Sequence, residues 1–382
     1  MRVGIDASNL RTGGGVTHLV ELLRSSDPTV HRFDTVTIWG GSDTLAALPS
    51  APWLRLRHEP HLDKGLLSRL SWQRWTLGRR LAEAASDVLF APGGSYGGRF
   101  RPFVTMSRNL LPFEPVESQR YGLSSMRLKL WLLRCAQAMT FRRAAGVIFL
   151  NDHARRSVEA VTGTLPGLVR VIPHGIAEAF RLRPRRARLL TEASAVEPLQ
   201  LLYVSTVEPY KHQWHVVDAV GQLRSAGLPV SLDLVGGGRA LWQRRLREAI
   251  ARTDPAGVFI HYSGAVPHGD LPERYRRADV FIFASTCENM PNILLEAMAS
   301  GLAIACARHP PMSVMLGDAG MYFDPERPAE IASALQALLE NPAARTAGAE
   351  AAFTRAAAYS WTRCADETFA LLRAVHEAAG AR

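Results

Sequence analysis

The sequence predicts an α/β protein with two doubly wound, Rossmann-like domains. At 382 residues with 47% hydrophobic content, the chain is too long for one ordinary core and long enough for two. Strand-like apolar runs alternate with helical segments in both halves, and an arginine-rich segment separates the halves. We therefore expect an N-terminal domain over 1–180, a linker over 181–198, a second domain over 199–360 and a C-terminal helix over 361–382 that packs back toward the N-terminal domain.

Short apolar runs bounded by turn residues predict the strands of both domains. In the first domain they lie at 2–8, 35–39, 87–91, 102–106, 145–150 and 169–173. In the second domain they lie at 199–205, 230–235, 258–262, 280–284 and 303–306, and an alanine-rich helical tail begins near 328. Because strands buried on both faces read as continuous apolar runs, we expect parallel sheets covered by helices.

Composition excludes several protein classes. The four cysteines (Cys135, Cys287, Cys306 and Cys364) lack metal-ligand spacing, which favours reduced thiols over a disulfide framework or a zinc site. The first eight residues read as a strand and lack the apolar core of a secretory signal, and no run of about 18 apolar residues exists to span a membrane. These features predict a cytoplasmic enzyme.

The formal charge of +10 calls for an acidic partner or a self-repelling surface. Lysine occurs only at positions 64, 129 and 211, and every other basic residue apart from histidine is arginine. Such a skew makes a lysine in a motif stand out.

Two glutamates, Glu288 and Glu296, lie eight residues apart around a predicted helix start. With Pro291 at a first helical position, Asn289 as a cap and Gly301 after the end, we expect the helix from about 291 to 300. Because a buried unpaired carboxylate is costly, Glu296 needs a partner, either a ligand or a basic neighbour. The helix N-terminus favours a phosphate, so both glutamates are expected to converge on an anion site.

Three consecutive glycines, Gly13 to Gly15, follow the first predicted strand and precede a segment with helical apolar spacing. Glycines there permit a tight turn and a close backbone approach to a phosphate or sugar. The alternative is a plain strand-to-helix turn.

Together these segments resemble the retaining glycosyltransferases of family 4, which have the two-domain GT-B fold. The match is to their Glu-x7-Glu motif, and it continues through 201–211, 234–238, 262–266, 317–320 and 322–325. In the N-terminal half it rests on 13–15, 107–113 and 171–175. The resemblance implies two facing Rossmann-like domains with the active site in the cleft between them.

The resemblance also implies an activity: transfer of a sugar from a nucleoside diphosphate sugar to a glycan or lipid-linked glycan acceptor, with retention at the anomeric carbon. The Cys-Glu-Asn-Met-Pro-Asn version of the motif leans toward bacterial surface-polysaccharide enzymes of the mannosyl or rhamnosyl type that use GDP-mannose or a GDP-deoxyhexose. No cofactor or metal is implied, since the donor is a substrate. Two alternatives stay open: a sugar-nucleotide epimerase of the same fold, and a basic nucleic-acid-binding protein.

In this resemblance Glu288 and Lys211 are the catalytic residues, with Glu288 beside the anomeric carbon and Lys211 on the departing diphosphate. The family usually has an arginine where this chain has Thr206, and a His-Asp or His-Asn pair where it has Arg108 and Asn109. His174 falls in a turn for which a structural role and a donor contact are both open. The residues assigned to substrate binding are Glu296, Gly13, Gly14, Gly15, Arg108, Asn109, His174, Thr206, Gly236, Gly237, Val266, Asn289, Met290 and Asn292.

A basic helix predicted over 120–143 also carries Leu, Trp, Met and Phe, and Trp72 to Trp75 with Arg79 and Arg80 repeats this composition. Either segment is suited to an anionic membrane surface, which would place the enzyme peripherally on the inner face of the inner membrane. The alternative is a core-packing helix whose arginines face water.

Overall fold

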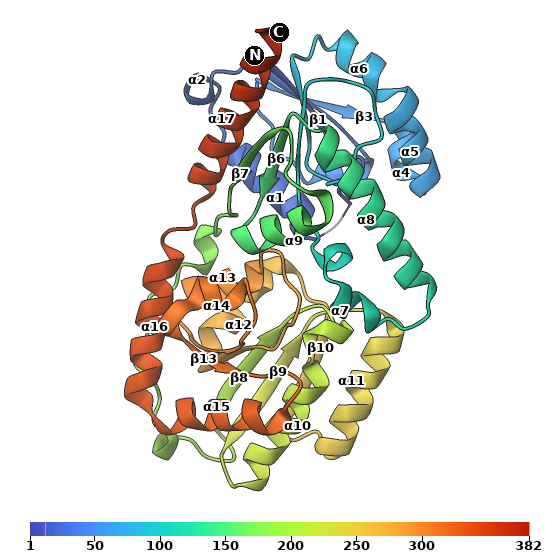
Figure 1. The fold of residues 1–382 in the computed structure, drawn as a ribbon. Helices are drawn as coiled ribbons and strands as arrows, with labels where there is room; N and C mark the ends of the chain where they lie inside the picture. Colours follow the sequence, from blue (N-terminus) through green and yellow to red (C-terminus); the bar gives the residue numbers. More distant parts are fainter. Residues whose placement is uncertain (12, 382) are drawn as a thin grey trace. The chain divides into compact units, whose positions relative to one another are not determined.

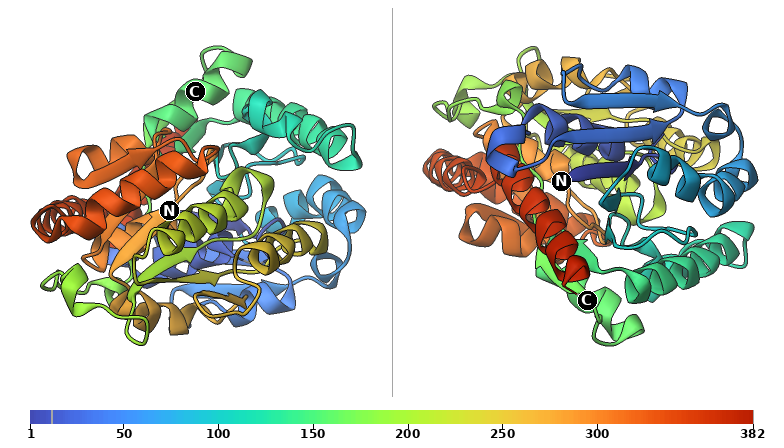
Figure 2. Two further views of the ribbon diagram at one scale, coloured as in Figure 1. Left: turned by 90° about the horizontal axis from the view of Figure 1, so that it is seen from below. Right: turned by 90° about the horizontal axis from the view of Figure 1, so that it is seen from above.

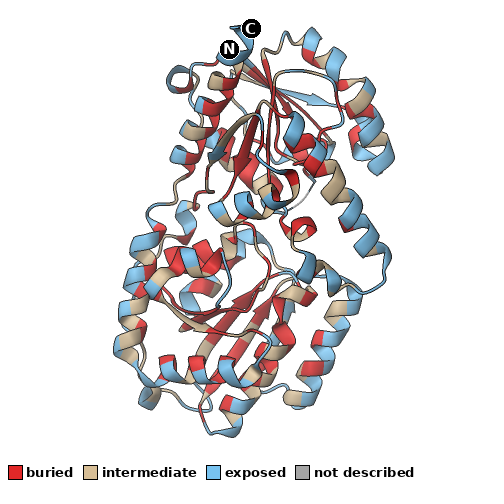
Figure 3. Ribbon diagram, in the orientation of Figure 1, coloured by how far each residue is buried: buried red, intermediate tan, exposed pale blue. Residues whose placement is uncertain are grey.

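The computed structural model describes residues 1–11 and 13–381 and divides into two compact units. Unit 1 comprises Met1–Gly175 and Tyr359–Arg382, and unit 2 comprises Ile176–Ala358 (Figure 1). The strands of both units are largely buried, whereas the outer faces of the helices are exposed (Figure 3).

Unit 1 is built on a parallel sheet of seven strands in the order β3-β2-β1-β4-β5-β6-β7. The strands are β1 (Arg2–Asp6), β2 (Thr35–Gly40), β3 (Leu54–His58), β4 (Val88–Ala91), β5 (Phe103–Met106), β6 (Gly146–Phe149) and β7 (Leu168–Val171). In β1, Val3 pairs with Val36 of β2 on one side and with Val88 of β4 on the other. The strand order reverses between β1 and β4, where ligands of such sheets bind.

The helices of unit 1 are α1 (Gly14–Arg24), α2 (Pro28–His31), α3 (Ser42–Ala46), α4 (Pro60–Asp63), α5 (Leu66–Trp75), α6 (Leu77–Glu83), η1 (Leu111–Phe113), α7 (Pro115–Gln119), α8 (Ser125–Arg143), α9 (Asp152–Thr162) and α17 (Trp361–Gly380). The C-terminal helix α17 packs on α1 and on strands β4 to β7. It is joined to α2 through His31 Nε2, which lies 2.8 Å from a carboxylate oxygen of Asp366.

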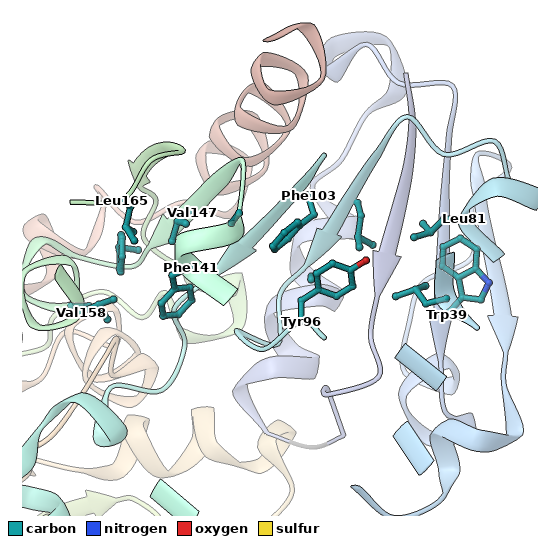
Figure 4. Packing of buried hydrophobic residues seen from close by; sticks show 14 of the residues in the cluster. Trp39, Leu81, Tyr96, Phe103, Phe141, Val147, Val158 and Leu165 are labelled. Atoms are coloured by element: carbon teal, nitrogen blue, oxygen red, sulfur yellow. The ribbon is translucent and has the colours of Figure 1, made fainter. Parts of the chain in front are cut away.

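One face of the unit 1 sheet carries an aromatic and aliphatic core (Figure 4). Tyr96 and Phe103 lie with ring centroids 4.7 Å apart, and Trp39 and Leu81 continue the cluster toward the edge of the sheet. Burial of large side chains of this kind contributes about 1.5 to 3 kcal/mol each.

Unit 2 is built on a parallel sheet of six strands in the order β10-β9-β8-β11-β12-β13. The strands are β8 (Leu199–Val204), β9 (Val230–Val235), β10 (Ile260–Gly264), β11 (Val280–Phe283), β12 (Ala303–Ala307) and β13 (Gly320–Phe323). Its helices are η2 (Glu178–Phe180), η3 (Leu190–Glu192), η4 (Pro209–Lys211), α10 (Gln213–Ser225), α11 (Ala240–Thr253), η5 (His268–Asp270), α12 (Leu271–Arg277), α13 (Asn292–Ala299), α14 (Met312–Leu316), η6 (Gly317–Ala319), α15 (Pro328–Glu340) and α16 (Pro342–Ala356).

The two parallel, doubly wound sheets confirm the fold class, but two strands were not predicted. β3 lies at an edge of the unit 1 sheet; it alternates Leu and Arg, and its residues are mostly exposed. β13 lies at an edge of the unit 2 sheet; it is short and begins with glycine. Edge strands lack the continuous apolar run of a strand that is buried on both faces.

The basic segment over 181–198, expected to be a linker, falls within unit 2. Guanidinium groups of Arg185 and Arg188 lie 3.6 and 3.4 Å from the carboxylate of Asp279, just before β11. The side chain of Asp279 is only 3% exposed, so these arginines compensate a buried charge.

Neither a membrane-spanning helix nor a cluster of metal-ligating side chains is found among the described residues. Along residues 1–11 and 13–381, no helix has both the length and the apolar character needed to cross a bilayer. Over the same residues, no group of three or more His, Cys, Asp or Glu side chains is arranged to hold a metal ion.

Candidate functional site

The site in unit 2 lies at the carboxyl ends of β8 and β11, where the strand order reverses. From β8 the chain steps outward to β9 and β10, and β11 then returns to pair with β8 on its other side. Loops leaving two such strands diverge and leave room for a ligand between them. Here the two loops are tied together by one backbone hydrogen bond, from Thr286 N to Tyr210 O at 2.9 Å.

Each of these loops supplies one predicted catalytic residue, and the structure brings the two together. Lys211 Nζ, at the end of η4, donates a hydrogen bond to Glu288 Oε1 in the loop after β11. The two side chains are 7% and 13% exposed, so the pair is largely removed from water. The lysine is held by its main chain, whose carbonyl accepts from the Tyr203 hydroxyl. Burial, with the Glu288 charge second, holds the pKa of Tyr203 well above its usual range, so Tyr203 stays a neutral donor.

Glu296 is buried on α13 and accepts two side-chain hydrogen bonds. Its Oε1 lies 3.0 Å from His268 Nε2, and its Oε2 accepts from the Tyr275 hydroxyl at 3.1 Å. Tyr275 is fully buried, whereas the His268 side chain is 55% exposed. Glu296 therefore has one fixed partner, on α12, and one partner from η5 that a ligand hydroxyl can replace.

The N-terminus of α13 differs in detail from the prediction. The helix begins at Asn292, and Pro291 rather than Asn289 occupies the capping position, with no side-chain cap and no acidic residue in the first turn. The expectation that Asn289 caps the helix is wrong, because Asn289 turns into a buried position in the preceding loop. Met290 and Asn292 are partly buried beside it. A helix start without an acidic cap keeps its partial positive charge for an anion.

Glycines after β9 form one wall of this site. Gly236 has φ of 139°, and a Cβ there would lie 1.9 Å from Ser205 O, so the position requires glycine. Its nitrogen donates to Gly264 O at 2.7 Å and its oxygen accepts from the Tyr262 hydroxyl at 2.9 Å. The ends of β8, β9 and β10 are thereby fixed to one another.

The remaining predicted residues of unit 2 lie along these same strand ends. Gly237 packs against Ala265, and Val266 follows β10 and is partly buried. Thr206 is exposed after β8, and its carbonyl accepts from Gln213 Nε2 at 2.9 Å.

In unit 1 the three glycines form the start of α1, the first helix after β1. Gly13 is the capping residue with φ of 68°, and Gly14 and Gly15 open the helix, which has no side-chain cap and no acidic residue in its first turn. The guanidinium of Arg108 lies against Gly15, since a Cβ there would come within 2.2 Å of it. Any larger residue at position 15 would displace Arg108.

Arg108 is a cation at the positive end of a helix. Among residues 1–11 and 13–381, its Nε is buried without a hydrogen-bond partner, and burial lowers the pKa of its guanidinium to about 10 with no carboxylate contributing. The guanidinium and the partial positive charge of the helix N-terminus repel each other, and a bound anion would offset this repulsion. The arrangement is therefore suited to a phosphate or a carboxylate.

His174 packs inside unit 1. Its ring lies 4.9 Å from that of His18 on α1 and stacks at 5.6 Å on Trp361 of α17. A Cβ on Gly175 would lie 2.1 Å from Trp361 N, so the glycine lets the chain pass directly under α17. Asn109 is exposed and accepts from Leu111 N at 3.2 Å, which shapes η1. These contacts explain both residues as structural elements of unit 1.

Sequence reasoning missed three side chains at these sites: His18 beside His174, and His268 and Tyr275 beside Glu296. Burial, followed by the charges of His174 and Arg108, keeps the pKa of His18 well below its usual value, so its ring is neutral. The only signal for the Glu296 partners was the requirement that a buried carboxylate be compensated.

Comparison with known proteins finds the same architecture. Residues 198–341 match the family model described as Glycosyl transferases group 1. The chain is 27% identical to O-antigen chain mannosyltransferase B of Escherichia coli over 44% of each protein. It is 27% identical to D-inositol 3-phosphate glycosyltransferase 1 of Catenulispora acidiphila over 91% of this chain and 89% of that one.

Among solved structures, sucrose-phosphate synthase from Thermosynechococcus elongatus aligns with a TM-score of 0.78 and 17% identity, over 99% of this chain and 100% of that chain. This likeness concerns the fold, and it confirms the two Rossmann-like units expected from the sequence.

Proposed function

Because residues 198–341 match the glycosyl transferases group 1 model and the chain has the GT-B fold, we propose that this protein transfers a sugar from a nucleoside diphosphate sugar to an acceptor hydroxyl. Retention at the anomeric carbon, as in family 4, is part of the proposal. Unit 2 is the donor domain, and unit 1 is the acceptor-side domain.

The observation that carries the proposal is the pairing of the charged groups in unit 2. Lys211 and Glu288 form an ion pair that is largely shielded from water. Glu296 is held by Tyr275, and its second partner, His268, can be replaced by a ligand group. A nucleoside diphosphate sugar offers the complementary groups: a diphosphate for Lys211, sugar hydroxyls for Glu288 and ribose hydroxyls for Glu296. Each ligand group replaces a protein partner rather than leaving a buried charge alone.

The chemical step places negative charge on the departing diphosphate. Lys211 and the free N-terminus of α13 stabilise that charge as it develops. Glu288 holds the donor sugar beside its anomeric carbon. No metal ion or organic cofactor takes part, and a front-face displacement needs no covalent nucleophile.

Unit 1 supplies a second anion site at Gly13 to Gly15 with Arg108. In this proposal it binds an acidic group of the substrate. Asn109 and His174 lie in the same unit and contact substrate in this proposal, in addition to their packing roles.

For the substrates, GDP-mannose or a GDP-deoxyhexose is the favoured donor, and a glycan or lipid-linked glycan of the cell surface is the acceptor. The support is the form of the Glu288 motif and the likeness to a relative named as an O-antigen chain mannosyltransferase. Lipopolysaccharide or another surface polysaccharide is then the product, made on the cytoplasmic side.

The decisive experiment measures thermal unfolding with GDP, UDP, dTDP and ADP in turn. A ligand at 100 times its dissociation constant stabilises the protein by about 2.7 kcal/mol, a shift of a few degrees that is easily resolved. We expect GDP to give the largest shift. If no nucleoside diphosphate raises the unfolding temperature, the donor site is wrongly assigned.

Product analysis then separates the alternatives. Incubation with the donor sugar and an acceptor, followed by NMR of the anomeric proton, reports transfer and its stereochemistry. Conversion of the donor to an epimer without an acceptor would instead identify an epimerase. Retention on DNA in a salt-dependent manner, with no donor binding, would favour a nucleic-acid-binding protein.

A further inference from the structure

Helices α5 and α8 of unit 1 are basic and contain no acidic residue. Their 10 and 19 residues carry no Asp or Glu, whereas α5 has Arg69 and Arg74 and α8 has four arginines and Lys129. Within the described residues, none of these cations forms an ion pair with a carboxylate. Arg69, Arg142 and Arg143 donate to main-chain carbonyls, so all seven cations lack a carboxylate partner in the described part of the chain but only some of them are open to a ligand.

The same helices expose large apolar side chains. Leu67 and Trp75 are 82% and 69% exposed, and Trp131 is 59% exposed. We call the full set the α5–α8 surface: Leu66, Leu67, Leu70, Trp75, Leu128, Trp131, Leu132 and Met139. Figure 3 shows exposed residues along much of α8, and Figure 2 shows this helix along the outside of unit 1 in both views.

The apolar residues of α8 fall on two separate faces. Leu130, Ala138 and Phe141 are buried and attach the helix to unit 1. Leu128, Trp131, Leu132 and Met139 recur at steps of three, four and seven residues, which forms a second stripe that faces solvent. The alternative of an ordinary core-packing helix explains the first face and leaves the second without a function.

Both helices pack on the loop between β4 and β5, so they are attached to the same segment of unit 1. Gln73 of α5 accepts from Gly97 N at 2.8 Å, and Thr140 of α8 accepts from Tyr96 N at 3.0 Å. In the same loop, the guanidinium of Arg99 lies 5.9 Å from the ring centre of Trp75.

We propose that the α5–α8 surface binds the anionic surface of a lipid bilayer. Leucine and tryptophan side chains insert at the boundary between headgroups and acyl chains, and flanking arginines and Lys129 meet the negative headgroups. Two basic helices without acidic residues are complementary to a negatively charged partner. Their exposed apolar side chains form a stripe rather than a pocket, which suits insertion into a fluid bilayer better than binding of a discrete ligand. This inference is independent of the proposed reaction, because membrane binding is measured without any sugar donor.

The test is sedimentation of the full chain with vesicles of phosphatidylcholine alone or with added phosphatidylglycerol. We expect at least tenfold stronger binding to the anionic vesicles, weakened by salt because the Debye length shrinks. Equal binding to both vesicle types, or to neither, overturns the proposal.

Two variants examine the surface itself: W131S/L132S for the apolar stripe and R127E/K129E for the charge. Each should lower binding to anionic vesicles at least tenfold while the unfolding temperature stays unchanged, because these four side chains are exposed. The matched control is L241S on α11, which removes a 55% exposed leucine from unit 2 and should bind like the parent.

Size-exclusion chromatography of the same proteins examines the rival occupant, a second copy of the chain. A dimer that W131S/L132S converts to a monomer, with vesicle binding unchanged, would make the α5–α8 surface a protein interface and overturn the proposal.

Discussion

Replacing Glu296 probes the donor site with the least damage to the fold. Its carboxylate accepts from Tyr275 at 3.1 Å and lies 3.0 Å from His268 Nε2. In the variant Glu296→Ala, the Tyr275 hydroxyl keeps the Ile293 carbonyl at 3.2 Å, and His268 is exposed enough to bond water. The free energy of unfolding should therefore fall by only about 1 to 2 kcal/mol.

Donor affinity should fall further. A hydrogen bond to a charged group contributes about 1.5 to 3 kcal/mol, so loss of the Glu296 carboxylate should raise the dissociation constant of the nucleoside diphosphate roughly 10- to 150-fold. Glu296→Gln, which keeps the volume and removes only the charge, should show a smaller loss of about tenfold.

Isothermal titration calorimetry with the preferred nucleoside diphosphate measures both variants. The control is Glu330→Gln, a half-exposed carboxylate on α15 that should not change affinity. Unchanged affinity in both Glu296 variants would refute the assignment of Glu296 to the donor and leave it a structural partner of Tyr275.

Four further predictions concern charge. Lys211→Met should destabilise the fold by about 3 to 5 kcal/mol, because Glu288 is left buried alone, and the double variant with Glu288→Gln should recover stability in urea titrations but not activity. Glu288→Gln alone should keep nucleotide affinity and lower kcat at least tenfold, about 1.4 kcal/mol of barrier; near-normal turnover would remove Glu288 from catalysis. Burial lowers the pKa of His18, so below about pH 6.5 the unfolded chain binds a proton at this histidine that the folded chain does not bind. The contribution of His18 to the free energy of unfolding is therefore complete above about pH 6.5 and falls by about 1.4 kcal/mol per pH unit below it. His18→Gln should flatten this pH dependence in denaturation curves. Initial rates should survive excess EDTA, since Lys211 and the α13 N-terminus carry the diphosphate charge; loss of rate restored by magnesium would contradict that assignment.

The sequence by itself determined the features that depend on local pattern. Buried parallel strands must be apolar on both faces, so the inner strands could be predicted from the chain. The edge strands β7 and β10 were also predicted, whereas the edge strands β3 and β13 were not. Gly13 and Gly236 also follow from local pattern, because both have a positive φ, which favours glycine wherever the rest of the chain lies. The Glu288 and Glu296 spacing followed from the motif alone.

Tertiary structure decided which side chains meet. That Lys211 reaches Glu288 depends on β8 and β11 being neighbours, and that Glu296 is held by Tyr275 depends on how α12 packs beside α13. The contact of Arg108 with Gly15 joins segments that are remote in sequence. Such partners carry no local signal, because the cost of burying a charge fixes that a partner must exist but not which residue provides it. Only the folded sheet order brings that residue within hydrogen-bonding distance.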